Sequence, residues 1–197
     1  MSIILASASP ARAAVLRNAG LEFDIRPARV DEEEIKLSLK AEGAPPERVA
    51  ETLAELKMRR ASVPGDRSFV IGCDQMLACD GEWFDKPEDM AAARMQLRRL
   101  RGKTHQLHAA ICVGRDGGVI WHHMETARLT MRDFSDDFLE AYLVQAGDGI
   151  LASVGAYRLE DIGVQLFSRI QGDYFTILGL PLLPLLDFLR NNSVVRI

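Results

Sequence analysis

The sequence has few residues that could build a disulfide framework or a transition-metal site. It contains three cysteines and four histidines in 197 residues. Cys73, Cys79 and Cys112 are odd in number, lack Cys-x-x-Cys spacing and lie in apolar stretches, which is typical of reduced core cysteines. His122 and His123 are neighbours on an expected strand, so their side chains point to opposite faces and cannot share one metal ion. Disulfide, zinc and redox chemistry are therefore not expected.

A surplus of positive charge and a long uninterrupted apolar run are also missing. The formal net charge is −4, which argues against non-specific binding to nucleic acid and requires a local Lys and Arg cluster for any anionic ligand. The apolar stretch from Ile177 to Leu189 is interrupted by a glycine, two prolines and an aspartate, and the N-terminus lacks the features of a signal peptide. We therefore expect a cytoplasmic protein with no membrane segment and no nucleic-acid partner.

A nucleotide-binding P-loop is absent as well. Gly102-Lys103-Thr104 resembles its end, but the pattern requires a glycine five positions before Gly102, where the sequence has Leu97. The chain contains no internal repeat and no low-complexity linker. With 48% hydrophobic and 26% charged residues, positions 1–197 are expected to form a single domain, or one domain with two lobes.

The N-terminal stretch combines an expected strand, a hydroxyl-rich turn and the start of a helix. Ile3 to Ala6 is a short apolar run, and Ser9 with Pro10 is a good beginning for a helix that runs to about Ala19. Free amides and the helix dipole favour an anion there, so Ser7, Ser9 and Arg12 are candidates for binding a phosphate. The alternative is an ordinary capped helix, which is the commoner use of this pattern.

Two further stretches place charged side chains in unusual positions. The run from Val30 to Glu34 contains four consecutive acids, which by default form a solvated surface segment, although one of them could hold a cation. A helix is expected from about Pro46 to Ala61, and Lys57 lies in a stripe of that helix that is otherwise made of alanines. The lysine either faces a ligand or extends from the edge of the core.

The stretch from Phe69 to Gln75 is predicted to be a buried strand that ends in an acid and an amide. Ligands tend to bind at the carboxyl ends of such strands. Asp74 is therefore the best candidate for a catalytic carboxylate, and the alternative is an ordinary turn aspartate.

Lys86 is expected to be fixed by the elements on either side of it. Asp80-Gly81 predicts a hairpin between 76–78 and 82–84, and Pro87 is expected to begin a helix that runs to Leu100. The other predicted elements are strands at 21–25, 105–113 and 119–131, a helix between Ser135 and Gly147, and a last helix that ends near Asn191.

A series of these stretches matches one known family in order and spacing. The stretches are Ser7-Ala8-Ser9-Pro10-Ala11-Arg12, Val30-Asp31-Glu32, Leu53-Ala54-Glu55-Leu56-Lys57, Gly72-Cys73-Asp74-Gln75, Lys86-Pro87, Leu100-Arg101-Gly102-Lys103-Thr104-His105, Gly155-Ala156-Tyr157, and Gly172-Asp173-Tyr174 through Gly179-Leu180-Pro181-Leu182. They cover nearly the whole chain and resemble the Maf family of nucleotide pyrophosphatases.

The resemblance implies both a fold and an activity. The implied fold is α/β, of the Maf and ITPase-like type, with a long curved mixed β-sheet, helices on both sides, and two lobes around a central cleft. The implied activity is hydrolysis of a nucleoside triphosphate to the monophosphate and pyrophosphate, which keeps non-standard nucleotides out of nucleic acid. A divalent cation, Mg²⁺ or Mn²⁺, and often a homodimer are also implied.

The resemblance also assigns roles to the candidate residues. Asp74 would act as the general base on a water that attacks the α-phosphorus. Arg12, Lys57 and Lys86 would neutralise charge on the triphosphate and the departing pyrophosphate, while Ser7 and Ser9 bind phosphate oxygens. Glu32 would help Asp74 to hold the metal, because Mg²⁺ commonly takes only one or two carboxylates.

Departures from the commonest Maf pattern bear on the substrate. Ala11, Gln75 and Glu160 stand where the family often has arginine, threonine and glutamine, and they resemble the branch that hydrolyses 7-methyl-GTP. A carboxylate at Glu160 can accept from both N1–H and the exocyclic amine of guanine, whereas uracil and thymine offer one donor. Gln75 and Glu160 are therefore assigned to substrate binding. The alternatives are a dTTP and UTP pyrophosphatase of the same family, or a non-catalytic nucleotide-binding regulator of septum formation and cell division.

Overall fold

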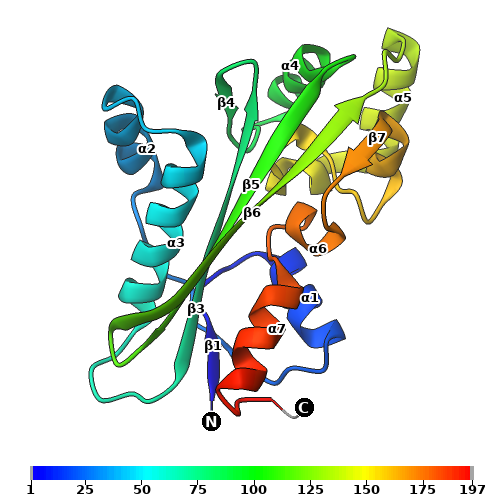
Figure 1. Ribbon diagram of the computed structural model, residues 1–197. Helices are drawn as coiled ribbons and strands as arrows, with labels where there is room; N and C mark the ends of the chain where they lie inside the picture. The colour runs from blue at the N-terminus through cyan, green and yellow to red at the C-terminus, as the bar shows by residue number, and fades with distance from the viewer. Residues whose placement is uncertain (1, 196–197) are drawn as a thin grey trace. The chain divides into compact units, whose positions relative to one another are not determined.

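The structure is a computed structural model that describes residues 2–195 (Figure 1). Its helices are α1 (Pro10–Asn18), α2 (Glu32–Ala41), α3 (Pro46–Ala61), α4 (Met90–Leu100), α5 (Asp136–Ala146), α6 (Tyr174–Ile177) and α7 (Leu182–Asn191), with short 3-10 turns at Gly147–Ala152, Val154–Ala156 and Ile162–Leu166. Its strands are β1 (Ile3–Leu5), β2 (Asp24–Ile25), β3 (Phe69–Cys79), β4 (Glu82–Phe84), β5 (Thr104–Arg115), β6 (Gly118–Met131) and β7 (Phe167–Gln171).

The strands form one mixed sheet in the order β2-β1-β3-β5-β6-β7, and β4 pairs with β3 outside this path. β1 is parallel to both β2 and β3, whereas β4 is antiparallel to β3 and β7 is antiparallel to β6. Helices flank the sheet. The predicted α/β class with a mixed sheet is therefore confirmed.

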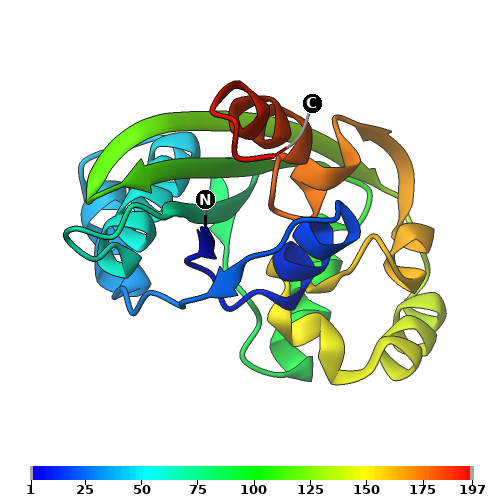
Figure 2. The ribbon, with the colours of Figure 1, turned by 90° about the horizontal axis from the view of Figure 1, so that it is seen from below.

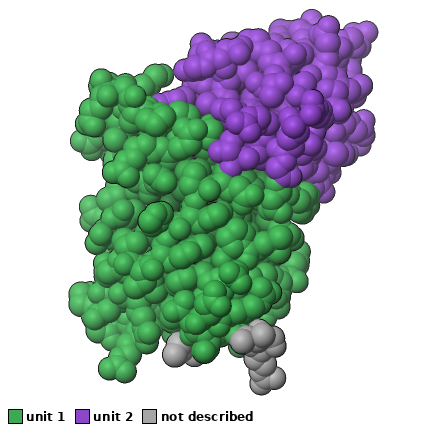
Figure 3. Space-filling model, in the orientation of Figure 1, with its two compact units in different colours: residues 1–75, 108–125, 173–197 green, residues 76–107, 126–172 purple. Residues whose placement is uncertain are grey.

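The chain divides into two compact units (Figure 3). Unit 1 comprises residues 1–75, 108–125 and 173–197, and unit 2 comprises residues 76–107 and 126–172. β3, β5 and β6 each contribute residues to both units. No helix among the described residues is long and apolar enough to cross a membrane.

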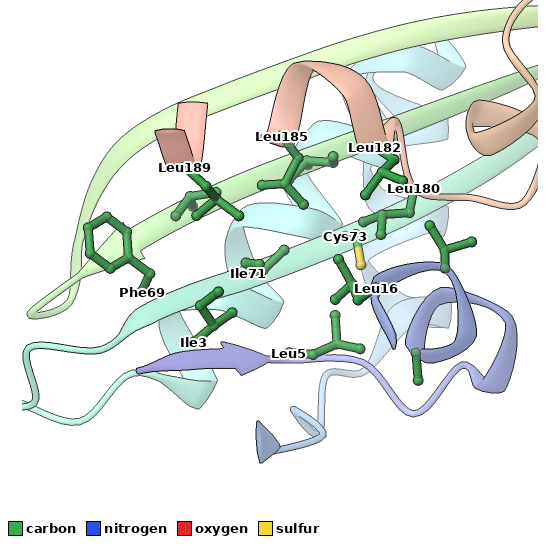
Figure 4. Packing of buried hydrophobic residues seen from close by; sticks show 14 residues of the cluster. Ile3, Leu5, Leu16, Phe69, Ile71, Cys73, Leu180, Leu182, Leu185 and Leu189 are labelled. Carbon is green, nitrogen blue, oxygen red and sulfur yellow. The ribbon is translucent and has the colours of Figure 1, made fainter. Parts of the chain in front are cut away.

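Unit 1 packs helices on both faces of its strands (Figures 1 and 2). On one face, side chains of α1 and α7 meet alternate residues of β1 and β3, as Leu16, Leu185, Leu5 and Ile71 illustrate (Figure 4). Each of these four side chains is fully buried, and burying a side chain of this size contributes about 1.5–3 kcal/mol. The opposite face of β3 packs against α3.

The core of unit 2 contains a buried polar pair. His105 Nε2 lies 2.8 Å from the hydroxyl oxygen of Tyr157, and both side chains are buried. Burial lowers the pKa of His105 to about 4, so its imidazole is neutral at pH 7. The hydroxyl of Tyr142 donates to the carbonyl oxygen of Ala156 at 3.1 Å. These bonds fix the segment around Ala156, which has a positive φ of 58°.

Most of the elements that the sequence predicts are confirmed. α1 begins at Pro10 with Ser9 as its N-cap, α3 spans Pro46–Ala61, and α7 ends at Asn191. α5 lies between Ser135, which caps it, and Gly147. The hairpin at Asp80-Gly81 is confirmed, since both residues have positive φ and join β3 to β4.

The prediction that the strand ends at Asp74 is wrong. β3 continues without interruption to Cys79, so Asp74 lies inside a strand and not at its end. The strand that ends here is the neighbouring β1. It pairs with β3 only as far as Leu5 opposite Ile71, and the amide of Ala6 donates to the carbonyl oxygen of Ile71. Asp74 therefore lies beyond the carboxyl end of β1. Ligands tend to bind at such ends, so a ligand beside Asp74 is still expected, although the strand that ends there is β1 and not β3.

Three further expectations need correction. The acidic run is exposed as expected, but it also begins a helix that the sequence did not predict, because the Asp31 side chain caps α2 and places the acids that follow in its first turn, where the helix dipole favours them. Pro87 does not begin a helix, since α4 begins at Met90 with Asp89 as its N-cap, and Lys86 precedes that start by several residues. The strand expected at 21–25 is limited to Asp24–Ile25.

The contact between α3 and β3 depends on Gly72. A Cβ atom at Gly72 would lie 2.1 Å from the carbonyl oxygen of Ala54 and 2.6 Å from the amide nitrogen of Met58. Both atoms belong to the α3 backbone and cannot move aside as a flexible side chain does. Val70, Gly72 and Asp74 share one face of β3 because side chains alternate along a strand, so the close approach also brings α3 to Asp74.

We predict that Gly72→Ala lowers the free energy of unfolding by about 3 kcal/mol, because the methyl group forces α3 away from β3. Gly118→Ala is the matched control, since the nearest atom to its Cβ would be the carbonyl oxygen of Arg115 at an ordinary 3.6 Å. Urea unfolding of both variants measures the effect. Equal stability of Gly72→Ala and the unaltered protein would contradict this account of the packing.

Candidate active site

A buried ion pair joins α3 to β3 in unit 1. Lys57 Nζ lies 2.5 Å from Asp74 Oδ1, and the two residues are 8% and 5% exposed. Ala50, Ala54 and Ala61 are buried beside Lys57 on α3, so the alanine stripe gives the lysine room to reach β3. Of the two interpretations of Lys57, the structure shows a side chain that reaches Asp74 on β3, and its contact with a ligand stays a prediction. Asp74 Oδ2 accepts no hydrogen bond from any residue between 2 and 195.

Glu32 completes a cluster of three charges. It is the first residue of α2, and its Oε1 lies 2.7 Å from Lys57 Nζ. Its side chain is far more exposed than that of Asp74, at 44% against 7%. One ammonium group therefore contacts a buried carboxylate on β3 and a solvent-facing carboxylate on α2.

The charges around Lys57 determine its protonation. Burial alone would lower the pKa of Lys57, and the positive charge of Arg12 acts in the same direction. Asp74 and Glu32 outweigh both effects, so the pKa of Lys57 is raised above its ordinary value and the ammonium form persists at pH 7. The Arg12 guanidinium lies near this cluster, since its Nη1 contacts the carbonyl oxygen of Cys73, the residue before Asp74.

Ser7, Ser9 and Arg12 lie together at the N-terminus of α1. Ser9 Oγ accepts from the Arg12 amide at 3.4 Å, while Ser7 Oγ accepts from the Ser9 amide and from an Arg12 guanidinium nitrogen, both at 3.2 Å. A hydroxyl that accepts two hydrogen bonds retains its own hydrogen to donate. The Ser7 O–H and the helix dipole can therefore both favour an anion at this position.

Hydrogen bonds to backbone carbonyls hold the Arg12 guanidinium in place. Nε donates to the carbonyl oxygen of Gly179 and Nη1 donates to that of Cys73, each at 2.9 Å. Gln75, two residues after Cys73 on β3, uses its amide nitrogen to contact the carbonyl oxygens of Thr176 and Ile177. The sequence reasoning did not identify Gly179 as part of this site, although the glycine in Gly179-Leu180-Pro181 marks a special backbone position.

The two remaining predicted residues, Lys86 and Glu160, belong to unit 2, whereas all the others belong to unit 1. Lys86 is exposed between β4 and α4. Glu160 Oε1 accepts from Arg158 Nε at 3.1 Å. The sequence reasoning missed Arg158 as a partner, although its spacing of two residues from Glu160 on an irregular segment allows such a contact.

The resemblance implies a divalent cation, and the carboxylates of unit 1 can be compared with what such a cation requires. Among residues 2–195 no group of three or more His, Cys, Asp or Glu side chains converges as a metal site. Two carboxylates, those of Glu32 and Asp74, do converge on one positive group, the ammonium of Lys57. Two carboxylates are sufficient for Mg²⁺, which fills its other positions with water and phosphate oxygens.

Comparison of the sequence with those of known proteins identifies the family of this chain. A model of the Maf-like protein family matches residues 2–192. A protein of Paramagnetospirillum magneticum named nucleoside triphosphate pyrophosphatase is 57% identical over 96% of this chain and 98% of its own length. A protein of Brucella abortus named 7-methyl-GTP pyrophosphatase is 49% identical over 99% and 98% of the two chains. A protein of Rhizobium etli with this second name is also 49% identical, over 98% of this chain and 97% of its own. Because the family match and these relatives both extend over nearly the full sequence, the chain belongs to the family of Maf-like proteins.

Proposed function

We propose that this protein is a nucleoside triphosphate pyrophosphatase. The observation that carries the proposal is the Asp74 carboxylate, which is buried beside Lys57 and keeps one oxygen atom, Oδ2, available for a water molecule. The names of the full-length relatives support the same activity. The reaction adds one water to the α-phosphorus and breaks the bond between that phosphorus and the oxygen that bridges to the β-phosphorus. The products are the nucleoside monophosphate and pyrophosphate.

Asp74 acts in this proposal as the general base. Its Oδ2 accepts a proton from the attacking water while Lys57 stabilises the negative charge at Oδ1. Proton transfer to a positioned carboxylate typically contributes about 10²–10⁴-fold to the rate. Because α3 and β3 hold Lys57 and Asp74 rigidly, the base is oriented before the substrate binds.

The positive groups stabilise the triphosphate in this proposal. Ser7 O–H, the Arg12 guanidinium and the N-terminus of α1 bind phosphate oxygens. Lys57, and Lys86 from unit 2, neutralise charge that develops on the departing pyrophosphate, and such stabilisation is usually the largest contribution to phosphoryl transfer.

A divalent cation, Mg²⁺ or Mn²⁺, would be held by Glu32 and Asp74. When bound, it neutralises charge on the phosphate oxygens. Both carboxylates contact the Lys57 ammonium, so they lie near each other before a cation binds.

The preferred base is proposed to be 7-methylguanine, with Glu160 as the residue that reads it. The Brucella abortus and Rhizobium etli relatives carry the name 7-methyl-GTP pyrophosphatase. Glu160 Oε1 is already bonded to Arg158, so a pyrimidine would not leave this carboxylate wholly without a donor. The cost of the wrong base is therefore smaller than for an isolated carboxylate. Hydrolysis of modified nucleotides would keep them out of nucleic acid.

The first test replaces the general base. We predict that Asp74→Asn lowers the rate of pyrophosphate release at least about 100-fold while nucleotide binding is largely retained, because the amide keeps the shape but cannot accept the proton. Release is measured with Mg²⁺ and a panel of nucleotides. Asp187→Asn, an exposed substitution on α7, is the matched control and should leave turnover unchanged. Near-normal turnover in Asp74→Asn would rule out this base, and a wild type that binds nucleotides without releasing pyrophosphate would favour a regulatory role.

The second test concerns the base. We predict that kcat/KM for 7-methyl-GTP exceeds that for dTTP and UTP by about 10- to 100-fold, and that Glu160→Gln reduces this ratio because an amide accepts at only one end. Glu140→Gln, which removes another carboxylate paired with an arginine in unit 2, should leave the ratio unaltered. Faster hydrolysis of dTTP or UTP by the wild type would overturn the choice of base and leave the pyrophosphatase activity standing.

A further inference from the structure

The side chain of Gln75 is occupied by the backbone of its own unit. Its Nε2 donates to the carbonyl oxygen of Thr176 at 2.9 Å and to that of Ile177 at 3.1 Å. A glutamine amide has two N–H donors, so both are used by these two carbonyls. The residue is only partly buried, but the atoms with which it would recognise acceptors on a nucleobase are already engaged.

The backbone that Gln75 holds leads directly to Arg12. Thr176 and Ile177 end α6, and Gly179 follows with a φ of +85° and accepts a hydrogen bond from Arg12 Nε at 2.9 Å. A Cβ atom at Gly179 would lie 3.1 Å from Arg12 Nε and 3.5 Å from Gln75 Oε1. A methyl group at Gly179 would therefore press on Arg12, while its contact with Gln75 would be an ordinary one.

A second carbonyl holds Arg12 from the β3 side. Arg12 Nη1 donates to the carbonyl oxygen of Cys73 at 2.9 Å, and Cys73 lies two residues before Gln75 on the same strand. The guanidinium is thus fixed between two backbone segments, β3 and the turn that contains Gly179. Gln75 is the side chain that ties this turn to β3, and Arg12 Nη2 has no partner among the described residues.

We propose that Gln75 is a positioning residue for Arg12. By holding Thr176 and Ile177 against β3, it places the Gly179 carbonyl so that the free Nη2 edge of the guanidinium faces the phosphates. This inference rests on the proposed function, which supplies the phosphates, and it replaces the sequence-based assignment of Gln75 to substrate binding. A reader of the base changes the ratio between substrates, whereas a positioning residue for Arg12 affects every nucleotide alike.

The test is a double-mutant cycle on Gln75 and Arg12. Gln75→Met keeps the length of the side chain but removes both donors, and Arg12→Ala removes the guanidinium. We expect Gln75→Met to lower kcat about 10- to 100-fold for 7-methyl-GTP, dTTP and UTP alike, since a displacement of about 1 Å at a charged group can cost this much. In the Arg12→Ala background the same substitution should lower kcat less than about 3-fold, because contributions of residues that act as a unit are not additive.

Two controls separate positioning from a loss of folding. Asn192→Leu removes another amide donor, which contacts the carbonyl oxygen of Phe188 at 2.9 Å near the end of α7, and should leave kcat unchanged. Gly179→Ala places a methyl group 3.1 Å from Arg12 Nε on a backbone with a φ of +85°, so it should displace Arg12 and lower kcat uniformly for the three nucleotides. If Gln75→Met does not fold, Gln75→Asn, which keeps the amide but withdraws it from the carbonyl oxygens of Thr176 and Ile177, takes its place in the cycle, and thermal melting shows which variants are folded.

The results that would overturn the positioning role of Gln75 differ from those that would overturn the proposed function. A changed ratio between 7-methyl-GTP and UTP in Gln75→Met, or a full loss that persists without Arg12, overturns the positioning role. If the wild type releases no pyrophosphate from any nucleotide, the proposed function fails, and the same cycle is measured as the affinity for inorganic tripolyphosphate by calorimetry. Non-additive losses of affinity would then uphold the positioning role. Additive losses, or no binding by the wild type, would overturn it.

Discussion

The contact between Lys57 and Asp74 is the interaction on which the candidate site in unit 1 depends. A buried carboxylate without a partner is strongly unfavourable, and removal of one partner from a buried pair typically costs about 3–5 kcal/mol. The ammonium can reach Asp74 only because α3 lies against β3 at Gly72, and because the neighbours of Lys57 on its own helix are alanines. Close backbone packing, small side chains and an internal charge pair are therefore parts of one arrangement. Glu32 on α2 adds a carboxylate that contacts the same ammonium group and faces the solvent.

Local patterns allowed several parts of this arrangement to be predicted from the sequence. The N-cap at Ser9, the alanine stripe around Lys57 and the switch from apolar to acidic residues at Asp74 all follow from rules that act within a few residues. The continuity of β3 through Asp74 and Gln75 did not follow, because the apolar pattern is interrupted there, whereas the backbone continues unbroken into the part that pairs with β4. The start of α4 was misplaced because the cap at Asp89 determines it and the earlier proline does not. α2 was missed although Asp31 and Glu34 have the spacing of an N-terminal cap.

The hydrogen-bond partners of the polar side chains at the candidate site could not be predicted from the sequence. A glutamine beside a candidate catalytic aspartate suits a substrate-binding role and a structural role equally well. Only the structure reveals that the Gln75 amide binds the carbonyls at the end of α6, and that Arg12 binds the carbonyls of Cys73 and Gly179. Likewise, the residue type at Glu160 suggests recognition of guanine, but Arg158 already satisfies one of its oxygens. Residue identity therefore predicts the available chemistry, while packing determines which partner each atom has.

In the proposed reaction, a water held by Asp74 attacks the α-phosphorus of a nucleoside triphosphate. Hydrolysis in H₂¹⁸O with Mg²⁺, followed by mass spectrometry of both products, tests this attack because the label marks the phosphorus that was attacked. The account predicts one ¹⁸O atom in the nucleoside monophosphate and none in the pyrophosphate. Label in the pyrophosphate, or release of labelled inorganic phosphate, would show attack at a different phosphorus and contradict it.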